Sequence, residues 1–414
     1  MGIFSVISLL GGLSIFLYGM DIMGDGLKSS SSKALKSMLE KVTHSAVLGM
    51  LTGTLVTSVI QSSTATIVLT VGLLSAGILN LRQSISIVMG ANIGTTVTAQ
   101  IIRLMDINSS GAAFIEIFKP STLAPLAVLC GIIFLKFVKS QKTKGIGMML
   151  MGFGILFTGL MGMTEAVSPL SESQAFTDVL QKFSDVPILG ILTGLITTFI
   201  VQSSSAVIGM VQALSSTGAF TFQTVYPLII GINLGTCITT AIVCSIGTDK
   251  DAKRTGIAHI LFNCIGTVLF MAAIPLLHHA GALNFIWGKP MNSGGIANFT
   301  TIFNLVTAVA LLPFTNQLVK LTTLIVKDSP DDTEDFYPEM RTLDEKLFIS
   351  PALALHQVNI AEASMGRLAR KNFNRSIDQL VSYDPERSAK ISSAEDRLDG
   401  FTDAAENYLI KLSN

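Results

Sequence analysis

The sequence predicts an all-α polytopic membrane protein built from inverted repeats, each containing a re-entrant helical hairpin. Three observations lead to this fold class: the composition, a series of long apolar stretches, and an internal repeat. Of 414 residues, 49% are hydrophobic and only 14% are charged, whereas about 25% of the residues in a soluble domain are charged. The formal net charge is zero, so we expect a lipid bilayer and no nucleic acid as partner.

Seven apolar stretches approach the ~20 residues that cross a bilayer as a helix. An acidic, polar stretch with two prolines follows the last of them. We therefore expect a transmembrane domain over residues 1–328 and a cytoplasmic helical segment over residues 329–414. The apolar stretches cover residues 3–20, 85–102, 123–137, 146–163, 226–246, 257–277 and about 296–318.

Two further segments are apolar at their ends and polar at their centres. Residues 48–77 contain the triplet Gln61-Ser62-Ser63 within about 30 residues. This length and this polar centre suit a re-entrant helical hairpin, which returns to the side from which it entered, better than a single crossing. Residues 189–218 have the same character around Gln202.

The membrane half contains an internal repeat with an offset of 141 residues. Each half has a span, a Gln-Ser-Ser segment, a span with an Asn-x-Gly-Thr signature, and another span. Repeat 1 covers about residues 3–140, repeat 2 covers about 145–277, and an extra span follows at about 296–318. With one hairpin and three crossings per half, the second half is inverted relative to the first. Three clusters of basic residues then lie on one side, which the positive-inside rule makes cytoplasmic, with the N-terminus outside.

The tail beyond residue 328 has the pattern of two amphipathic helices. Pro351 suits the first turn of a helix that should end near Phe373. A second helix should run from about Pro385 to Leu412. The two helices are expected to form a hairpin.

The polar triplets indicate an ion site where the two hairpin tips meet. The helices that return from the tips begin near the serines, and a helix N-terminus attracts anions. Hydroxyl and carbonyl oxygens also suit a hard cation, and we expect Gly94 and Gly235 to permit irregular backbone there. Close packing of helices explains a single cluster of small hydroxylated residues better than a site does. Its repetition, each time followed by a second polar signature, favours a site.

Paired Gln-Ser-Ser hairpins, each followed by Gly-x-Asn-x-Gly-Thr, resemble the type II sodium–phosphate cotransporter family. The segments FLYGMDIMGDGL, AHILFNCIGTVLF and IANFTTIFNLVTAVALLPF are also similar to that family. The resemblance covers residues 1–320, and the tail is similar to the start of a PhoU-like domain. It implies that phosphate is held between the tips by Gln61, Ser62, Ser63, Gln202, Ser203 and Ser204.

The resemblance also implies a sodium site that uses Thr236 and Thr239, with Ser205 as a contributor. By repeat symmetry we extend this site to Thr64, Asn92, Thr95 and Asn233.

We therefore expect sodium-coupled symport of inorganic phosphate across a bacterial inner membrane by alternating access. Sodium is the coupling ion, no cofactor is expected, and the sequence shows no pattern typical of an enzyme site. Homo-oligomerisation is left open. Three alternatives also remain open: the same fold carrying sulfate or a dicarboxylate, export of phosphate, and a membrane-bound phosphate sensor.

Overall fold

The computed structural model describes residues 3–40, 45–75, 78–106, 119–138, 140–169, 184–245, 250–327 and 351–413, with residues 178, 180, 182, 343 and 348. Within these residues the secondary structure is helical, apart from a single bridge between Thr221 and Pro290. The predicted all-α fold class is confirmed.

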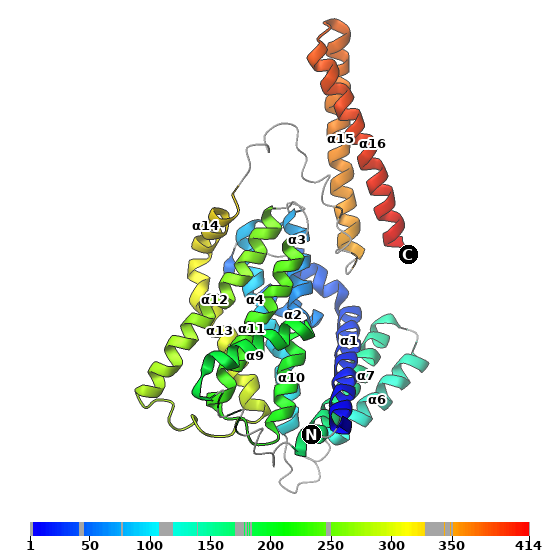
Figure 1. Cartoon of the computed structure of the whole chain (residues 1–414). Helices are drawn as coiled ribbons and strands as arrows, with labels where there is room; N and C mark the ends of the chain where they lie inside the picture. Colours follow the sequence, from blue (N-terminus) through cyan, green and yellow to red (C-terminus); the bar gives the residue numbers. More distant parts are fainter. Residues whose placement is uncertain are drawn as a thin grey trace.

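Seven of the described helices are long and apolar enough to cross a membrane, as the sequence predicts. The last continues through a short 3-10 turn into α14 (Thr315–Ile325). The seven helices, all labelled in Figure 1, are α1 (Ile3–Glu40), α4 (Leu81–Ile102), α6 (Pro120–Phe137), α7 (Gln141–Val167), α11 (Phe222–Ser245), α12 (Lys250–His279) and α13 (Ser293–Leu311).

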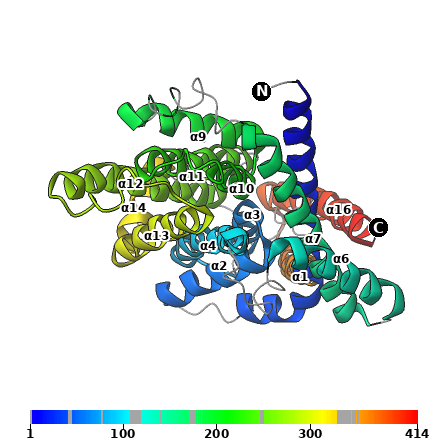
Figure 2. The same cartoon turned by 90° about the horizontal axis from the view of Figure 1, so that it is seen from below.

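Two pairs of shorter helices occupy the predicted hairpin segments. The first pair is α2 (Ala46–Ile60) and α3 (Ser63–Ser75); the second is α9 (Pro187–Val201) and α10 (Ser204–Ser215). In the first pair, Thr57 Oγ1 donates to Thr66 Oγ1 at 2.9 Å. These residues are nine apart and would be far from each other on one straight helix, so the chain folds back at the break. Figure 2 shows α3 and α10 near the middle of the helical body and α9 at its edge.

Glycines allow the first helix of each hairpin to pack backbone to backbone on the span that follows. A β-carbon on Gly53 or Gly90 would overlap the carbonyl groups of Ile87 or Met50, between α2 and α4. Gly194 and Gly231 make the equivalent contacts between α9 and α11. Small residues at such crossings are typical of helix pairs in membranes, and here they fix each hairpin to its own half.

The first span of each half packs along the other in the same way. A β-carbon on Gly12 would lie 2.9 Å from the Met163 backbone nitrogen, and Gly19 contacts Leu156 as closely. On the facing helix, Gly159 contacts Phe16. These glycines therefore let α1 and α7 pack backbone to backbone.

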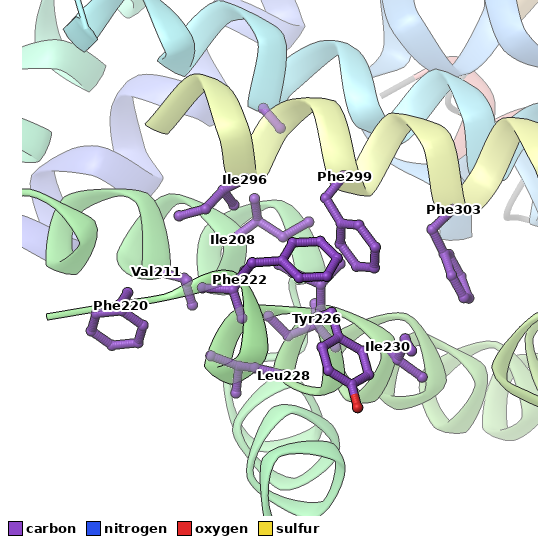
Figure 3. Close-up of a cluster of buried hydrophobic side chains, with 14 of the residues drawn as sticks. Ile208, Val211, Phe220, Phe222, Tyr226, Leu228, Ile230, Ile296, Phe299 and Phe303 are labelled. Atoms are coloured by element: carbon purple, nitrogen blue, oxygen red, sulfur yellow. The ribbon is translucent and has the colours of Figure 1, made fainter. Parts of the chain in front are cut away.

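Aromatic side chains fill the space between the second half and α13. The ring of Phe222 meets that of Phe299 edge to face with centroids 5.6 Å apart, and Phe270 and Phe303 lie 4.9 Å apart. Figure 3 shows Phe299 and Phe303 of α13 facing Phe222 and Tyr226 of α11. This cluster holds the extra span against the second half.

The tail forms the predicted helical hairpin, from α15 (Pro351–Val381) and α16 (Pro385–Ser413), which extends away from the membrane helices (Figure 1). The predicted end of the first helix at Phe373 is wrong. No proline or glycine lies between Phe373 and Pro385, so the helix continues for two more turns. At the base of the hairpin, Tyr408 joins a buried cluster that includes Leu73 and Leu79. Most of the acidic linker lies outside the described residues.

Replacing Gly90 or Gly231 by alanine should destabilise the protein, because the added methyl group has no space between the packed backbones. Overpacking of this kind costs about 1–3 kcal/mol, and thermal unfolding of the purified protein in detergent measures it. Gly11→Ala is the matched control, since a β-carbon at Gly11 meets nothing within 4 Å. Equal melting temperatures for Gly90→Ala and Gly11→Ala would contradict the packing.

Candidate functional site

The two hairpin tips enclose one small polar cavity. Its volume is about 50 Å³, where a single water needs roughly 10–15 Å³. It therefore has room for small ions. Its lining comes from both hairpins and from the spans that follow them: Gln61, Ser62, Ser63, Thr64, Thr95, Thr198, Gln202, Ser203, Ser204, Ser205, Thr236 and Thr239.

Each tip turns on a glutamine with left-handed backbone. Gln61 has φ 60° and Gln202 has φ 57°, and among the described residues these are the non-glycine residues with positive φ. Each caps the preceding helix, with its backbone N–H donating at 2.7 Å to the carbonyl of Thr57 or Thr198. Non-glycine residues in this region cost about 1–2 kcal/mol, and such strain gathers at functional sites. The break is therefore built identically in both halves.

The helices that leave the tips begin at the cavity with a serine cap. Ser62 Oγ accepts from the Ala65 N–H at 3.2 Å, and Ser203 Oγ accepts from the Ala206 N–H at 3.3 Å. The hydroxyl hydrogens of both serines remain able to donate. The other N–H groups of the first turns lack intrahelical partners. Two helix N-termini thus offer hydrogen-bond donors to an anion.

Among the described residues, the cavity is lined by glutamine, serine and threonine, with no charged side chain. Helix dipoles at the tips can offset part of the charge of an anion there, and a cation bound beside the anion would offset more. The threonine and serine hydroxyls and the carbonyls at the ends of α2 and α9 supply oxygen atoms for such a cation.

The structure brings most of the predicted site residues together. All six predicted phosphate residues line the cavity, and so do five of the predicted sodium residues, Thr64, Thr95, Ser205, Thr236 and Thr239. Asn92 and Asn233 are absent from this lining, and their side chains bind neighbouring helices.

The two asparagines connect spans instead. Asn92 Oδ1 accepts from Asn263 Nδ2 at 3.4 Å and lies 3.1 Å from His259 Nε2, which joins α4 to α12. Asn233 Oδ1 accepts from Asn304 Nδ2 at 3.3 Å, which joins α11 to α13. His259 and Asn263, one turn apart on α12, thus both bind the same asparagine of α4. The sequence could not show which helix each asparagine would face.

The expectation that Gly94 and Gly235 permit irregular backbone is wrong. Both lie inside regular helices, α4 and α11. A β-carbon on Gly94 would lie 2.6 Å from Thr57 Cβ, and one on Gly235 would lie 2.5 Å from Thr198 Cβ. The glycines let each hairpin approach the following span. Thr198 therefore reaches the cavity, where sequence reasoning missed it because a threonine in an apolar helix is typical of packing.

The glutamine side chains differ between the two tips. Gln61 Nε2 donates to the Ser58 carbonyl at 2.5 Å, and its Oε1 accepts from Thr98 Oγ1 at 2.6 Å. Gln202 makes no side-chain hydrogen bond within the described part of the chain, and Phe199 replaces Ser58 in the second half. The side chain of Gln61 is thus hydrogen-bonded within its own half. The side chain of Gln202 lines the cavity without a hydrogen bond to another described residue.

Comparison with known proteins identifies the family. The model of the Na+/Pi-cotransporter family matches the chain twice, over residues 15–165 and 161–308. The chain belongs to the Na+/Pi-cotransporter family. No solved structure matches it significantly.

Three relatives show the range of this similarity. "Uncharacterized protein YqeW" of Bacillus subtilis (strain 168) is 29% identical over 312 residues, 75% of this chain and 95% of that protein. "Putative inorganic phosphate export protein YjbB" of Escherichia coli (strain K12) is 22% identical over 409 residues, 99% of this chain and 71% of that protein. Human "Sodium-dependent phosphate transport protein 2B" is 34% identical over 108 residues, 26% of this chain and 16% of that protein. With seven apolar helices, this family member is a multi-pass membrane protein.

The two tip glutamines should respond differently to replacement by glycine. Gln202→Gly should raise thermal stability by about 1 kcal/mol, because glycine adopts the left-handed conformation freely. Gln61→Gly also relieves the left-handed backbone, but it loses the two side-chain hydrogen bonds of Gln61, of about 0.5–1.5 kcal/mol each. Its thermal stability should therefore stay level or fall. Melting temperatures of the purified variants measure this, and equal shifts would contradict the asymmetry.

Proposed function

We propose that this protein is a secondary-active symporter that couples inorganic phosphate to sodium across the bacterial inner membrane. The observation that carries the proposal is the single uncharged cavity formed by two repeat-equivalent Gln-Ser-Ser tips. Family membership supports a transporter rather than an enzyme. The cavity volume of about 50 Å³ suits a small inorganic anion better than an organic dicarboxylate.

Phosphate would bind between the N-termini of α3 and α10. The hydroxyls of Ser62, Ser63, Ser203 and Ser204 and the free N–H groups of the first turns would donate to its oxygens. The amide of Gln202 would reach it from the second tip, and Gln61 would contribute the second N–H of its side-chain amide, whose first N–H donates to the Ser58 carbonyl. All six side chains line the cavity.

Sodium would bind beside the anion, on neutral oxygens. The five lining residues Thr64, Thr95, Ser205, Thr236 and Thr239 supply hydroxyl groups, and hard cations prefer oxygen ligands. A cation next to the phosphate strengthens the binding of both ions, which is a coupling free energy between two ligands. The proposal for sodium omits Asn92 and Asn233, whose side chains bind α12 and α13.

We further propose that the two halves are inverted repeats, with re-entrant hairpins that enter from opposite faces. Two successive matches to one family model and the identical backbone breaks at Gln61 and Gln202 support this arrangement. Inverted repeats with broken helices at the midplane suit alternating access. Residues 329–414 would form a cytoplasmic PhoU-like segment, with the N-terminus outside.

Export of phosphate is the second candidate. The YjbB relative matches 99% of this chain and carries phosphate export in its name, whereas the human relative is named for sodium-dependent transport. Labelled phosphate uptake into proteoliposomes with an inward sodium gradient, repeated with potassium, tests the symport. Uptake that requires sodium supports symport and rules out a sensor as the main function. No flux in either salt, with folded protein, would overturn the proposal.

Ser62→Ala and Ser203→Ala should each weaken phosphate affinity by about 1–3 kcal/mol, because a partner of the lost hydroxyl stays desolvated. The rise in phosphate KM at saturating sodium measures this. Each serine also caps a helix, so thermal stability should fall by about 1 kcal/mol. Ser14→Ala, at an exposed position of α1, is the control. Unchanged KM in both tip variants would place the phosphate site elsewhere.

A further inference from the structure

The hydroxyl of Thr198 is buried at the cavity without a partner. The residue is 1% exposed and lines the cavity between the tips. Within the described part of the chain, its Oγ1 has no hydrogen bond. Burying a hydroxyl without a partner costs free energy, so this atom is suited to a ligand that enters the cavity.

The equivalent threonine in the first half is paired. Thr57 Oγ1 donates to Thr66 Oγ1 at 2.9 Å, and Thr66 Oγ1 donates to the Ser62 carbonyl at 3.0 Å. In the second half Val207 stands at the position of Thr66, and it is 2% exposed. Valine has the shape of threonine but no acceptor, so Thr198 has nothing to bind across its own hairpin.

The nearby side chains show the same difference. Thr98 holds Gln61, whereas its repeat equivalent Thr239 donates to the Thr236 carbonyl at 2.9 Å and lines the cavity. The first hairpin thus bonds the side chains of Thr57 and Gln61 within its own half. The second hairpin leaves Thr198 and Gln202 for a ligand.

The position of Thr198 distinguishes a cation from an anion. It lies in the last turn of α9, which ends at Val201. The carbonyl end of a helix carries partial negative charge and attracts cations, whereas the phosphate donors lie beyond the break, at the start of α10. Thr236, whose neighbour Gly235 packs directly on Thr198, adds a second hydroxyl to the same side of the cavity.

We propose that Thr198 Oγ1 is a ligand of the coupling cation, and that Val207 makes the second hairpin the cation-binding one by leaving this hydroxyl free. This inference rests on the proposed function and adds to it a residue and the reason for the asymmetry. In the first hairpin the equivalent threonine, Thr57, is paired to Thr66 and supplies no ligand to the cation.

Two variants test the proposal on the full-length protein. Thr198→Val removes the hydroxyl at constant shape, and Val207→Thr restores the partner that the first half has. Thr57→Val is the matched control, because it removes the equivalent buried hydroxyl, Thr57 is absent from the cavity lining, and Thr66 keeps its bond to Ser62. Thr198→Ser keeps the hydroxyl and should behave like the wild type.

Two readouts are measured. The first is the sodium concentration for half-maximal phosphate uptake, with phosphate KM determined at saturating sodium. The second is the rise in melting temperature of purified protein when sodium chloride replaces choline chloride, which needs no transport. We expect Thr198→Val to raise the half-maximal sodium concentration about tenfold and to lose the sodium-dependent rise in melting temperature. Val207→Thr should show a smaller shift in the same direction, and Thr57→Val should lie within twofold of the wild type.

The outcomes separate this inference from the proposed function. Without sodium, Thr198→Val should melt at or above the wild-type temperature, since it loses only an unpaired hydroxyl. Wild-type sodium dependence in both Thr198→Val and Val207→Thr would overturn the inference while leaving symport intact. An equal change in sodium dependence in Thr57→Val would also overturn the inference. A wild type whose uptake and melting temperature both ignore sodium would overturn the proposed function itself.

Discussion

A helix that stops inside a membrane leaves backbone N–H and C=O groups without partners, because no water is present to bind them. In the proposed arrangement the two helix breaks of this chain, at Gln61 and Gln202, lie inside the membrane, and neighbouring groups satisfy part of the backbone that each break exposes. The N–H groups of Gln61 and Gln202 close the preceding helices in the left-handed conformation, and Ser62 and Ser203 cap the following ones. Ser62, Ser63, Ser203 and Ser204 line one shared cavity, and in the proposed function a phosphate anion accepts hydrogen bonds there.

The surrounding helices hold the tips at this position. Glycines bring α2 against α4 and α9 against α11 at backbone distance, so that the threonine after each Asn-x-Gly lines the cavity. The asparagines of the same signatures bind outward, Asn92 to α12 and Asn233 to α13. One short sequence motif therefore serves close packing, cavity lining and attachment of a further span, in each half of the molecule.

The sequence predicted the spans, the two breaks and most of the cavity, because apolar length and a repeated polar triplet are local signals. It did not predict Thr198, whose role depends on Val207 lying across the hairpin and on Gly235 lying behind it. It misjudged Gly94 and Gly235, since a glycine needed for close packing cannot be told from one needed for irregular backbone until the facing helix is known. The end of α15 was misplaced because no residue near Phe373 marks a boundary.

The central claim is that two hairpins share one phosphate site whose occupancy depends on sodium. Equilibrium binding of labelled phosphate to the purified protein in detergent, in sodium and in potassium, measures its stoichiometry directly. The account predicts one phosphate per chain in sodium and much weaker binding in potassium. Two phosphates per chain, one for each hairpin, or equal binding in both salts would contradict it.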